Sequence, residues 1–394
     1  MRSNIMQNKN EQKKILYISL VDWFWIKQRP HHIPEILSER DHVDFVCIRS
    51  WIKNDKTLQI HDTSEENLDK VVFKINDNFT VYRKKILPKG SIPLIRTLNI
   101  NLFMKPFLSK LQKNNKYDAV ILTHPSQFAF LDKIKFKDTK IIYDCMDNYG
   151  AFTGAASSTI ASAEALLVKR ADFVIVSSNN LKNKLTENYP NEAKKLTVIN
   201  NGVDMKTFTL NQTIDTKETE IVKANNRKKV AYIGTISDWV NISMIYKLAK
   251  EMSNVDFYVV GPLDRHINMD EYNDLDNMIF TGPQPYYTVP AIIKQMDVMI
   301  MPFVLNEVVE SVNPVKIYEY LAMGKPVIAT GYSETYQFAN LIETYNTETE
   351  FAELLKNQLA INSDNPDLIE KRIAFASNNS WKQRANGFKK LIEP

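Results

Sequence analysis

The residues most able to do chemistry lie in one stretch of the C-terminal half, residues 313–330, which reads NPVKIYEYLAMGKPVIAT. Its pattern predicts a helix over residues 315–323, followed by a buried strand. Lys316 falls in the first turn, where the helix dipole disfavours a cation, and Glu319 lies on the same face. A diphosphate at the helix N-terminus would explain the lysine, and Glu319 could accept hydrogen bonds from the hydroxyls of a ribose. An ordinary ion pair on a solvated helix is the alternative.

Three polar residues of the N-terminal half follow predicted strands. His124 comes directly after the strand 119–123, and Asp144 and Asp147 follow the strand 140–143. An acidic side chain at a strand end could act as a base toward an acceptor hydroxyl, and helix capping is the equally weighted alternative. A lone histidine is also compatible with a structural role. We therefore treat His124, Asp144 and Asp147 as candidate catalytic residues.

Composition restricts the class of protein. The chain has 394 residues, 44% hydrophobic and 24% charged, with a net charge of +4 and two cysteines. The modest charge gives no indication of nucleic-acid binding, and the cysteine count predicts a reducing compartment. The sequence shows neither a long apolar segment nor a signal peptide, so we expect a cytoplasmic protein.

The order of predicted elements indicates an α/β protein. Apolar strands alternate with helices twice along the chain, first between residues 15 and 200 and again from residue 229. Near-continuous apolar strands of this kind form parallel sheets covered on both faces, and such sheets bind ligands beyond the carboxyl ends of their strands. We predict a domain at 1–208, a linker at 209–228, a second domain at 229–372 and a C-terminal helix at 373–394 that crosses back to the first domain.

One segment combines positive charge with apolar surface. Residues 83–116 carry nine Lys and Arg and no Asp or Glu, interleaved with many apolar side chains. Such a segment can lie on an anionic membrane face at the periphery of the bilayer. A surface helix that packs its apolar face inward is the alternative.

Several motifs, taken in order, resemble glycosyltransferase family 4. They are RPHHIPEIL, ADFVIVSS, INNGVDMKTF, FTGPQPYYTVPAII, DVMIMPF and YEYLAMGKPVIAT. A bacterial subgroup of teichuronic acid glycosyltransferases is more similar still, sharing W-x-x-Q-R-P, YDCMD and P-x-K-x-Y-E-Y-L-A. The resemblance implies the GT-B fold, in which two Rossmann-like doubly wound domains face a central cleft.

The resemblance also implies roles for individual residues. Glu319 would bind the ribose, while the family's first glutamate falls at Ser311, beside Glu310. The usual Arg and Lys after the first strand of the second domain are replaced here by residues 234–239, which leaves Lys316 as the cation for the diphosphate. The candidates for binding the nucleotide-sugar are Arg29, Gly234, Thr235, Gly261, Pro262, Gly282, Tyr287, Ser311, Asn313, Lys316 and Glu319.

These observations predict a hexosyltransferase that uses a nucleotide-sugar, with UDP-sugar as the expected donor, and a glycan or lipid-linked acceptor. Transfer should retain the anomeric configuration and need no cofactor and no metal, because the only D-x-D, at Asp274 and Asp276, lies in a polar loop rather than after a strand. Two alternatives are a nucleotide-sugar epimerase of the same fold and a non-catalytic partner subunit.

Overall fold

The structure is a computed structural model that describes residues 12–52, 64–131, 134, 136–151, 157–211, 220–264, 267–361 and 365–393. Contacts divide the chain into two compact units. The N-terminal unit comprises Met1–Cys145, Ser158–Ile175 and Ala385–Pro394, and the C-terminal unit comprises Met146–Ser157 and Val176–Arg384. The middle of the predicted linker, residues 212–219, lies outside the described residues.

The first sheet has eight strands in the order β3-β4-β2-β1-β5-β6-β7-β8. The pairings β1–β2, β1–β5, β2–β4 and β5–β6 are parallel, whereas β3 and β4 pair antiparallel. The strands are β1 (Lys14–Ile18), β2 (His42–Ser50), β3 (Val72–Asn76), β4 (Phe79–Ile86), β5 (Ala119–Leu122), β6 (Lys140–Cys145), β7 (Phe173–Val176) and β8 (Leu196–Val198).

The second sheet has six strands in the order β11-β10-β9-β12-β13-β14, and all neighbouring strands pair in parallel. The strands are β9 (Lys228–Ile233), β10 (Val255–Val260), β11 (Met278–Gly282), β12 (Val298–Met301), β13 (Val327–Thr330) and β14 (Glu343–Tyr345). The α/β class and the two doubly wound sheets predicted from the sequence are therefore confirmed.

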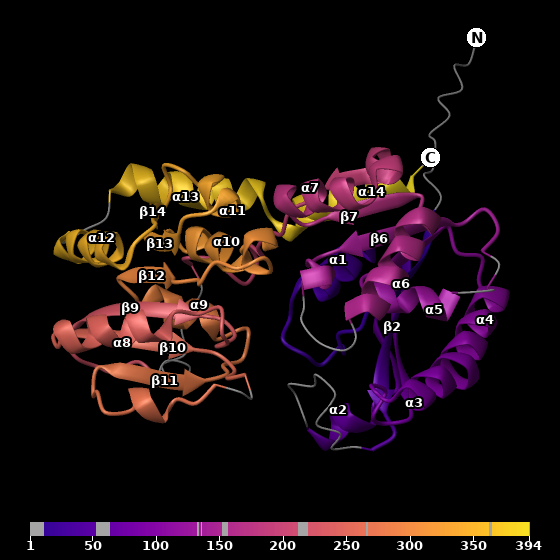
Figure 1. Ribbon diagram of the computed structural model, residues 1–394, viewed down its shortest axis with the longest axis horizontal. Helices are drawn as coiled ribbons and strands as arrows, with labels where there is room; N and C mark the ends of the chain where they lie inside the picture. The colour runs from indigo at the N-terminus through magenta and orange to yellow at the C-terminus, as the bar shows by residue number, and fades with distance from the viewer. Residues whose placement is uncertain are drawn as a thin grey trace, which may run out of the picture. The chain divides into compact units, whose positions relative to one another are not determined.

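Helices separate most of the strands in both sheets (Figure 1). Those before β9 are α1 (Arg29–Leu37), α2 (Glu65–Asp69), α3 (Pro93–Leu98), the π-helix η1 (Asn99–Met104), α4 (Lys105–Asn114), α5 (Phe128–Leu131), α6 (Ser157–Arg170) and α7 (Asn179–Asn188). Those after it are α8 (Ile242–Glu251), α9 (Val289–Lys294), α10 (Val315–Ala322), α11 (Ser333–Tyr336), α12 (Glu348–Ala360), α13 (Pro366–Asn378) and α14 (Trp381–Ile392). Short 3-10 turns connect several of them.

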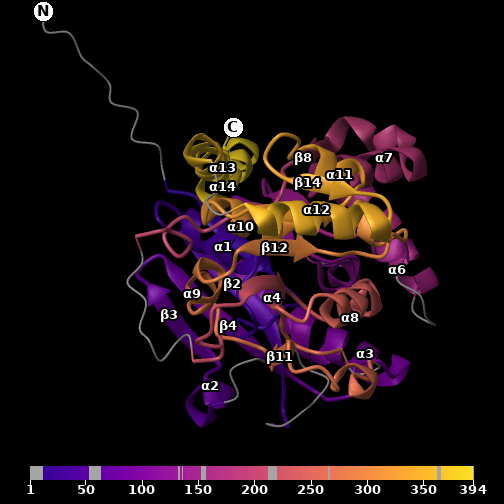
Figure 2. The same ribbon diagram turned by 90° about the vertical axis from the view of Figure 1, so that its left-hand side faces the viewer.

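Alternation along β9 gives the C-terminal unit two hydrophobic layers. Val230 and Tyr232 pack with α8 and α12 on one face of the sheet, whereas Ala231 and Ile233 pack with α9 and α10 on the other. Figure 2 shows α12 beside β12. A strand covered on both faces carries apolar residues at every position, which is why these strands appear as continuous apolar runs.

Three features differ from the expectation. The edge strand β3 is antiparallel, so the first sheet is not purely parallel. The segment 83–116 begins as a strand, because β4 extends to Ile86 before α3, η1 and α4 follow. The sequence predicts a helix near residues 34–39, whereas α1 starts at Arg29. Pro30 suits the first turn of a helix, and the Nδ1 atom of His31 accepts from the Gln28 amide at 3.2 Å.

Candidate functional site

The predicted donor residues of the C-terminal unit gather at the carboxyl edge of its sheet. Gly234 and Thr235 follow β9, Gly261 and Pro262 follow β10, and Gly282 ends β11. Main chains approach closely here, since a Cβ on Gly261 would lie 1.9 Å from the carbonyl oxygen of Gly234. Gly261 also has φ of +146°, a value that favours glycine. Only glycine therefore allows β9 and β10 to end side by side at this edge.

Lys316 and Glu319 form an ion pair on the first turns of α10. The Nζ atom of Lys316 donates to Oε2 of Glu319 at 2.6 Å. The Lys316 side chain is 30% exposed, whereas that of Glu319 is only 4% exposed. Burial raises the pKa of Glu319, and the nearby lysine opposes that shift. A buried carboxylate with one half-exposed cation has capacity to accept further hydrogen bonds.

The start of α10 has no side-chain cap within the described part of the chain. Its N-cap residue is Pro314, and no acidic residue lies in its first turn. The helix is held to the sheet by Tyr320, whose hydroxyl donates to the carbonyl of Ile233 at 3.2 Å and accepts from its amide at 3.0 Å. The helix dipole and Lys316 therefore present positive potential at the carboxyl edge of the sheet.

Asp204 is a residue near this pair to which the sequence analysis gave no role. Its charge adds to the rise in the pKa of Glu319, which places the two carboxylates close together. The Asp204 carboxylate accepts from the Lys206 amide at 3.0 Å and from the Thr207 hydroxyl at 2.8 Å. The available signal was the INNGVDMKTF motif, which contains Asp204 and lies at the end of the predicted first domain.

Ser311 and Asn313 are fully buried and hydrogen-bonded within the protein. The Ser311 hydroxyl donates to Oδ1 of Asn180 at 2.9 Å. The Asn313 side chain accepts from the Asn201 amide at 2.9 Å and donates to Glu334 at 3.3 Å. Both residues thus hold the loop before α10 in place, and their side chains are already engaged.

Glu334 is a second residue that the sequence analysis missed. Its carboxylate is 2% exposed and accepts from the Asn179 and Asn180 amides at 3.0 and 3.3 Å. It thereby caps the first turn of α7 from a distant part of the chain. The available signal was an acidic residue in the first turn of a helix that directly follows a buried strand.

Three further side chains of this region, Tyr287, Glu307 and Glu310, are exposed. Tyr287 is 60% exposed in the loop that follows β11. Glu307 and Glu310, which precede Ser311, the position of the family's first glutamate, are also exposed. All three side chains can therefore reach a ligand from solvent.

In the N-terminal unit, Arg29 and Asp144 form a buried ion pair. The Nη2 and Nε atoms of Arg29 donate to the Asp144 carboxylate at 2.7 to 3.1 Å. Arg29 is 3% exposed and Asp144 is fully buried, and the guanidinium also lies 5.4 Å from the ring centre of Phe388 on α14. The sequence analysis assigned these two residues separate roles, whereas in the structure each neutralises the other.

His124 caps a turn rather than pointing freely into solvent. Its Nδ1 atom accepts from the Ser126 amide at 3.1 Å and lies 2.9 Å from the Ser126 hydroxyl. Burial lowers the pKa of His124 to about 4, so its imidazole is neutral at pH 7. Asp147 is partly buried and follows β6, where its carbonyl accepts from the Tyr149 amide at 3.0 Å.

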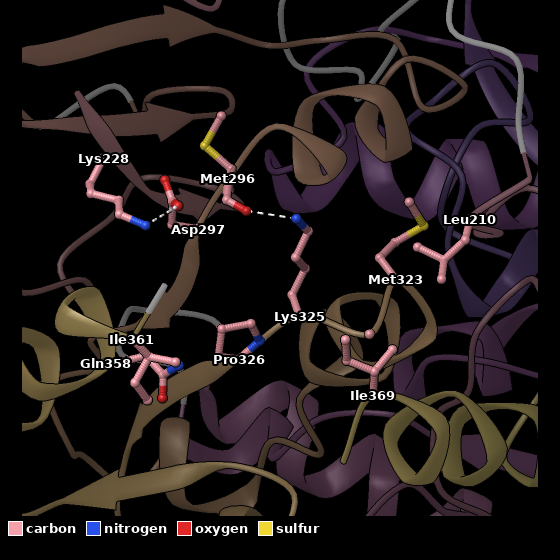
Figure 3. Close-up of a pocket in the computed structure, with 11 residues that line it drawn as sticks. Leu210, Lys228, Met296, Asp297, Met323, Lys325, Pro326, Gln358, Ile361 and Ile369 are labelled. Atoms are coloured by element: carbon pink, nitrogen blue, oxygen red, sulfur yellow. Dashed lines mark hydrogen bonds and ion pairs between the residues drawn. The ribbon is translucent and has the colours of Figure 1, made fainter. Parts of the chain in front are cut away.

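A hollow of about 280 Å³ lies at the opposite, amino-terminal edge of the six-stranded sheet (Figure 3). Its charged groups are engaged within the protein, since Lys228 pairs with Asp297 at 3.1 Å and Lys325 donates to the Met296 main-chain carbonyl at 2.7 Å. The loops at the carboxyl edge do not reach it, so this hollow is separate from the candidate donor site.

Comparison with known proteins identifies the class. Residues 65–207 match the model of Glycosyltransferase Family 4, and residues 227–361 match a model described as glycosyl transferases group 1. Together these matches cover most of the chain between residues 65 and 361. The chain is therefore a glycosyltransferase of the GT-B fold. The family 4 match confirms the resemblance predicted from the sequence motifs, and the group 1 match of the C-terminal region adds to it.

Two curated relatives agree with this class. TuaH of Bacillus subtilis, whose name assigns it provisionally to teichuronic acid biosynthesis as a glycosyltransferase, is 25% identical over 79% of this chain and 78% of its own length. An uncharacterized glycosyltransferase of Methanocaldococcus jannaschii is 24% identical over 92% of this chain and 96% of its own.

Solved structures agree on the fold. Sucrose-phosphate synthase from Thermosynechococcus elongatus superimposes with a TM-score of 0.69 at 14% identity, covering 96% of this chain and 98% of that one. Anabaena HepE in complex with UDP-glucose superimposes with a TM-score of 0.68 at 13% identity, covering 97% and 99%.

The Arg29–Asp144 pair gives a prediction about stability. Asp144→Ala should lower the free energy of unfolding by about 3–5 kcal/mol, because it leaves the Arg29 charge buried without its carboxylate. The double variant Arg29→Met, Asp144→Leu should recover most of this loss, since it removes both charges. Urea denaturation followed by circular dichroism measures both.

The matched control is Glu35→Ala, which removes the partner of Lys27 in a pair at 2.6 Å whose side chains are about one third exposed. Its effect should stay below about 1 kcal/mol. If Asp144→Ala is no more destabilising than this control, the pair is not a structural element.

Proposed function

We propose that this glycosyltransferase takes a hexose from a UDP-sugar and transfers it to a cell-envelope glycan or a lipid-linked acceptor, with retention of configuration and without a divalent metal. The observation that carries the proposal is the Lys316–Glu319 pair at a helix start without a side-chain cap. A nucleoside diphosphate needs a cation for its phosphates and an acceptor for its ribose hydroxyls, and this pair offers both.

The chemistry follows from the charges. Transfer leaves negative charge on the departing diphosphate, which the α10 amide groups and Lys316 would stabilise. The ribose hydroxyls would donate to the Glu319 carboxylate. Because this carboxylate is buried, each added hydrogen bond would contribute favourably to the free energy of binding. His124, neutral at pH 7, would hydrogen-bond the sugar rather than donate a proton to it.

The relatives support the substrates. The HepE structures contain UDP and UDP-glucose in a protein of the same fold, which supports a UDP-sugar as donor. The name of TuaH supports an acceptor in the cell envelope. Retention of configuration is proposed from the resemblance of residues 313–330 to family 4.

The first functional prediction concerns donor binding. Glu319→Ala and Lys316→Ala should each weaken UDP binding by about tenfold or more, because each removes hydrogen bonds to a charged group worth roughly 1.5–3 kcal/mol. Isothermal titration calorimetry with UDP measures the dissociation constants.

The control is Glu192→Ala, which breaks a pair with Lys195 of the same spacing and the same 2.6 Å length in a 3-10 turn. UDP affinity should not change in this variant. Equal UDP affinity in Glu319→Ala and Glu192→Ala would contradict the proposed donor site.

The second functional prediction concerns metal. UDP release from UDP-glucose, with a bacterial membrane extract as the acceptor source, should continue at the same rate in EDTA, because Lys316 and the helix start stabilise the diphosphate. Asp274 and Asp276, the formal D-x-D, are engaged by the Tyr246 hydroxyl at 3.0 Å and by Arg227 at 3.3 Å. Loss of activity in EDTA that Mn²⁺ restores would disprove the metal-independent step.

NMR analysis of the glycosylated product should show the anomeric configuration of the donor.

The proposed acceptor chemistry extends to a membrane contact through residues 83–116 and the adjacent residues 51–52. No helix in the described part of the chain is both long and apolar enough to cross a bilayer. Apolar side chains nevertheless remain exposed here, with Leu94 at 69% and Leu102 at 63%, and Trp51 at 53%. Basic residues of the same segment include Lys85, Lys89 and Lys110, all exposed. Apolar groups flanked by cations favour an anionic lipid surface.

The third functional prediction tests this contact. Replacing Leu94 and Leu102 together by Gln should reduce sedimentation with phosphatidylglycerol vesicles, and so should replacing Lys85, Lys89 and Lys110 by Gln or raising the salt. Leu166→Gln is the control, because Leu166 is 54% exposed on α6 outside this segment. Binding that is indifferent to these changes would contradict the membrane contact.

A further inference from the structure

Two buried arginines lie in the carboxyl-terminal halves of neighbouring strands in the N-terminal unit. Arg49 near the end of β2 is 2% exposed, and Arg83 on β4 is 1% exposed. In the parallel register Cys47 lies opposite Arg83 and Arg49 lies opposite Lys85. Because side chains alternate along a strand, Arg49, Arg83 and Lys85 emerge from the same face of the sheet. Three cations therefore share a small area.

One buried carboxylate serves this group. The Nε atom of Arg83 donates to Oδ2 of Asp22 at 2.9 Å, and the other oxygen of Asp22 accepts from the Phe24 amide at 2.9 Å. The ion-pair partner of Arg49 is Asp69, whose Oδ1 atom lies 3.7 Å from the Nη2 atom of Arg49 and whose side chain is 59% exposed. The nearby carboxylates therefore compensate the positive charge of Arg83 well and that of Arg49 poorly.

The rest of Arg83 holds the covering segment. Its Nη1 atom donates to the carbonyl of Asn67 and to that of Lys70, the latter at 2.7 Å, and its guanidinium lies 4.8 Å from the ring centre of Phe24. These contacts fix the end of α2 and the loop after β1 beside the arginine. The Nη2 atom of Arg83 takes part in none of these hydrogen bonds.

Donors on both arginines have no acceptor. The Nη2 atoms of Arg49 and Arg83 are buried and have no hydrogen-bond partner within the described part of the chain. A guanidinium stays charged at any ordinary pH, so neither residue can relieve the cost by losing a proton. Burial and the neighbouring Arg83 both lower the pKa of Arg49, which is the expected effect of two like charges held close together.

We propose that Arg49 and Arg83 form a binding site for an oxyanion, a phosphoryl or carboxylate group carried by the acceptor. Such a group matches the planar fork of a guanidinium and would accept from both Nη2 atoms. It would take the place that Asp69 now occupies beside Arg49. Both arginines lie toward the carboxyl ends of their strands, the edge at which parallel sheets bind their ligands. The identification of the anion with the acceptor rests on the proposed function, whereas the anion site itself does not.

The test uses the full chain saturated with UDP, so that the donor site cannot take up the probe. Inorganic phosphate and glucuronate are titrated separately by calorimetry, and the melting temperature is followed in parallel. Each anion that binds should raise the melting temperature of the wild type. Arg49→Gln should weaken binding by about tenfold or more and abolish that rise, since it removes a hydrogen bond to a charged group.

Two variants sharpen the result. Arg49→Lys keeps the charge but not the fork, so its affinity should fall between those of the wild type and Arg49→Gln. Lys84→Gln removes the same charge from β4 on the opposite face, where Lys84 lies 5.2 Å from the ring centre of Phe107, and should leave binding unchanged. Arg83 is not replaced, because it also anchors α2.

Phosphate binding alone would indicate a phosphorylated acceptor, and glucuronate binding alone an acidic sugar; both support the site. Binding of neither probe to the wild type, or equal binding to wild type and Arg49→Gln, would overturn it. UDP affinity is measured in every variant. Failure of UDP to bind would count against the donor site only, which keeps the two proposals distinguishable.

Discussion

The donor region depends on the contact between the Tyr320 hydroxyl and the main chain of Ile233. Because Ile233 is the last residue of β9, hydrogen bonds to both its amide and its carbonyl fix α10 relative to the carboxyl edge of the sheet. Burial strongly raises the pKa of Tyr320, so the hydroxyl keeps the proton that it donates. Lys316 and Glu319 are thus positioned by packing, so the nucleotide that we propose would not have to spend binding energy on ordering them.

The buried charged groups of this chain differ in how completely their charge is compensated, and this difference is the basis on which we distinguish structural groups from proposed ligand-binding groups. Arg29 and Asp144 are balanced and fully paired, which is the signature of a structural ion pair. Glu319 has one half-exposed partner and spare acceptor capacity. Arg49 has spare donors and a distant, exposed partner. Unbalanced charge is costly to bury, so the two unbalanced groups are those to which we assign ligands of opposite character.

The loop before α10 shows how the protein accommodates a departure from its family. The position where the resemblance places a glutamate is Ser311, which is buried and bonded to Asn180. Glu334 supplies a carboxylate from α11 to the same network, where it caps α7 and bonds Asn313. A second buried carboxylate at position 311 would lack a compensating cation among these partners. The exposed Glu307 and Glu310 are therefore the acidic groups of this loop left free to approach a sugar.

The sequence by itself determined the class, the alternation of strands and helices, and the motif that forms α10. These follow from local patterns, namely apolar runs, strand-ending glycines and a helix with Lys316 and Glu319 three residues apart. It did not reveal β4, because a buried Arg83 interrupts the apolar pattern of that strand. Only the tertiary structure decided that Arg29 meets Asp144, 115 residues away, and that Arg49 and Arg83 share one face. Such contacts depend on strand order and register, which arise from packing of the whole sheet and leave no mark on the local sequence.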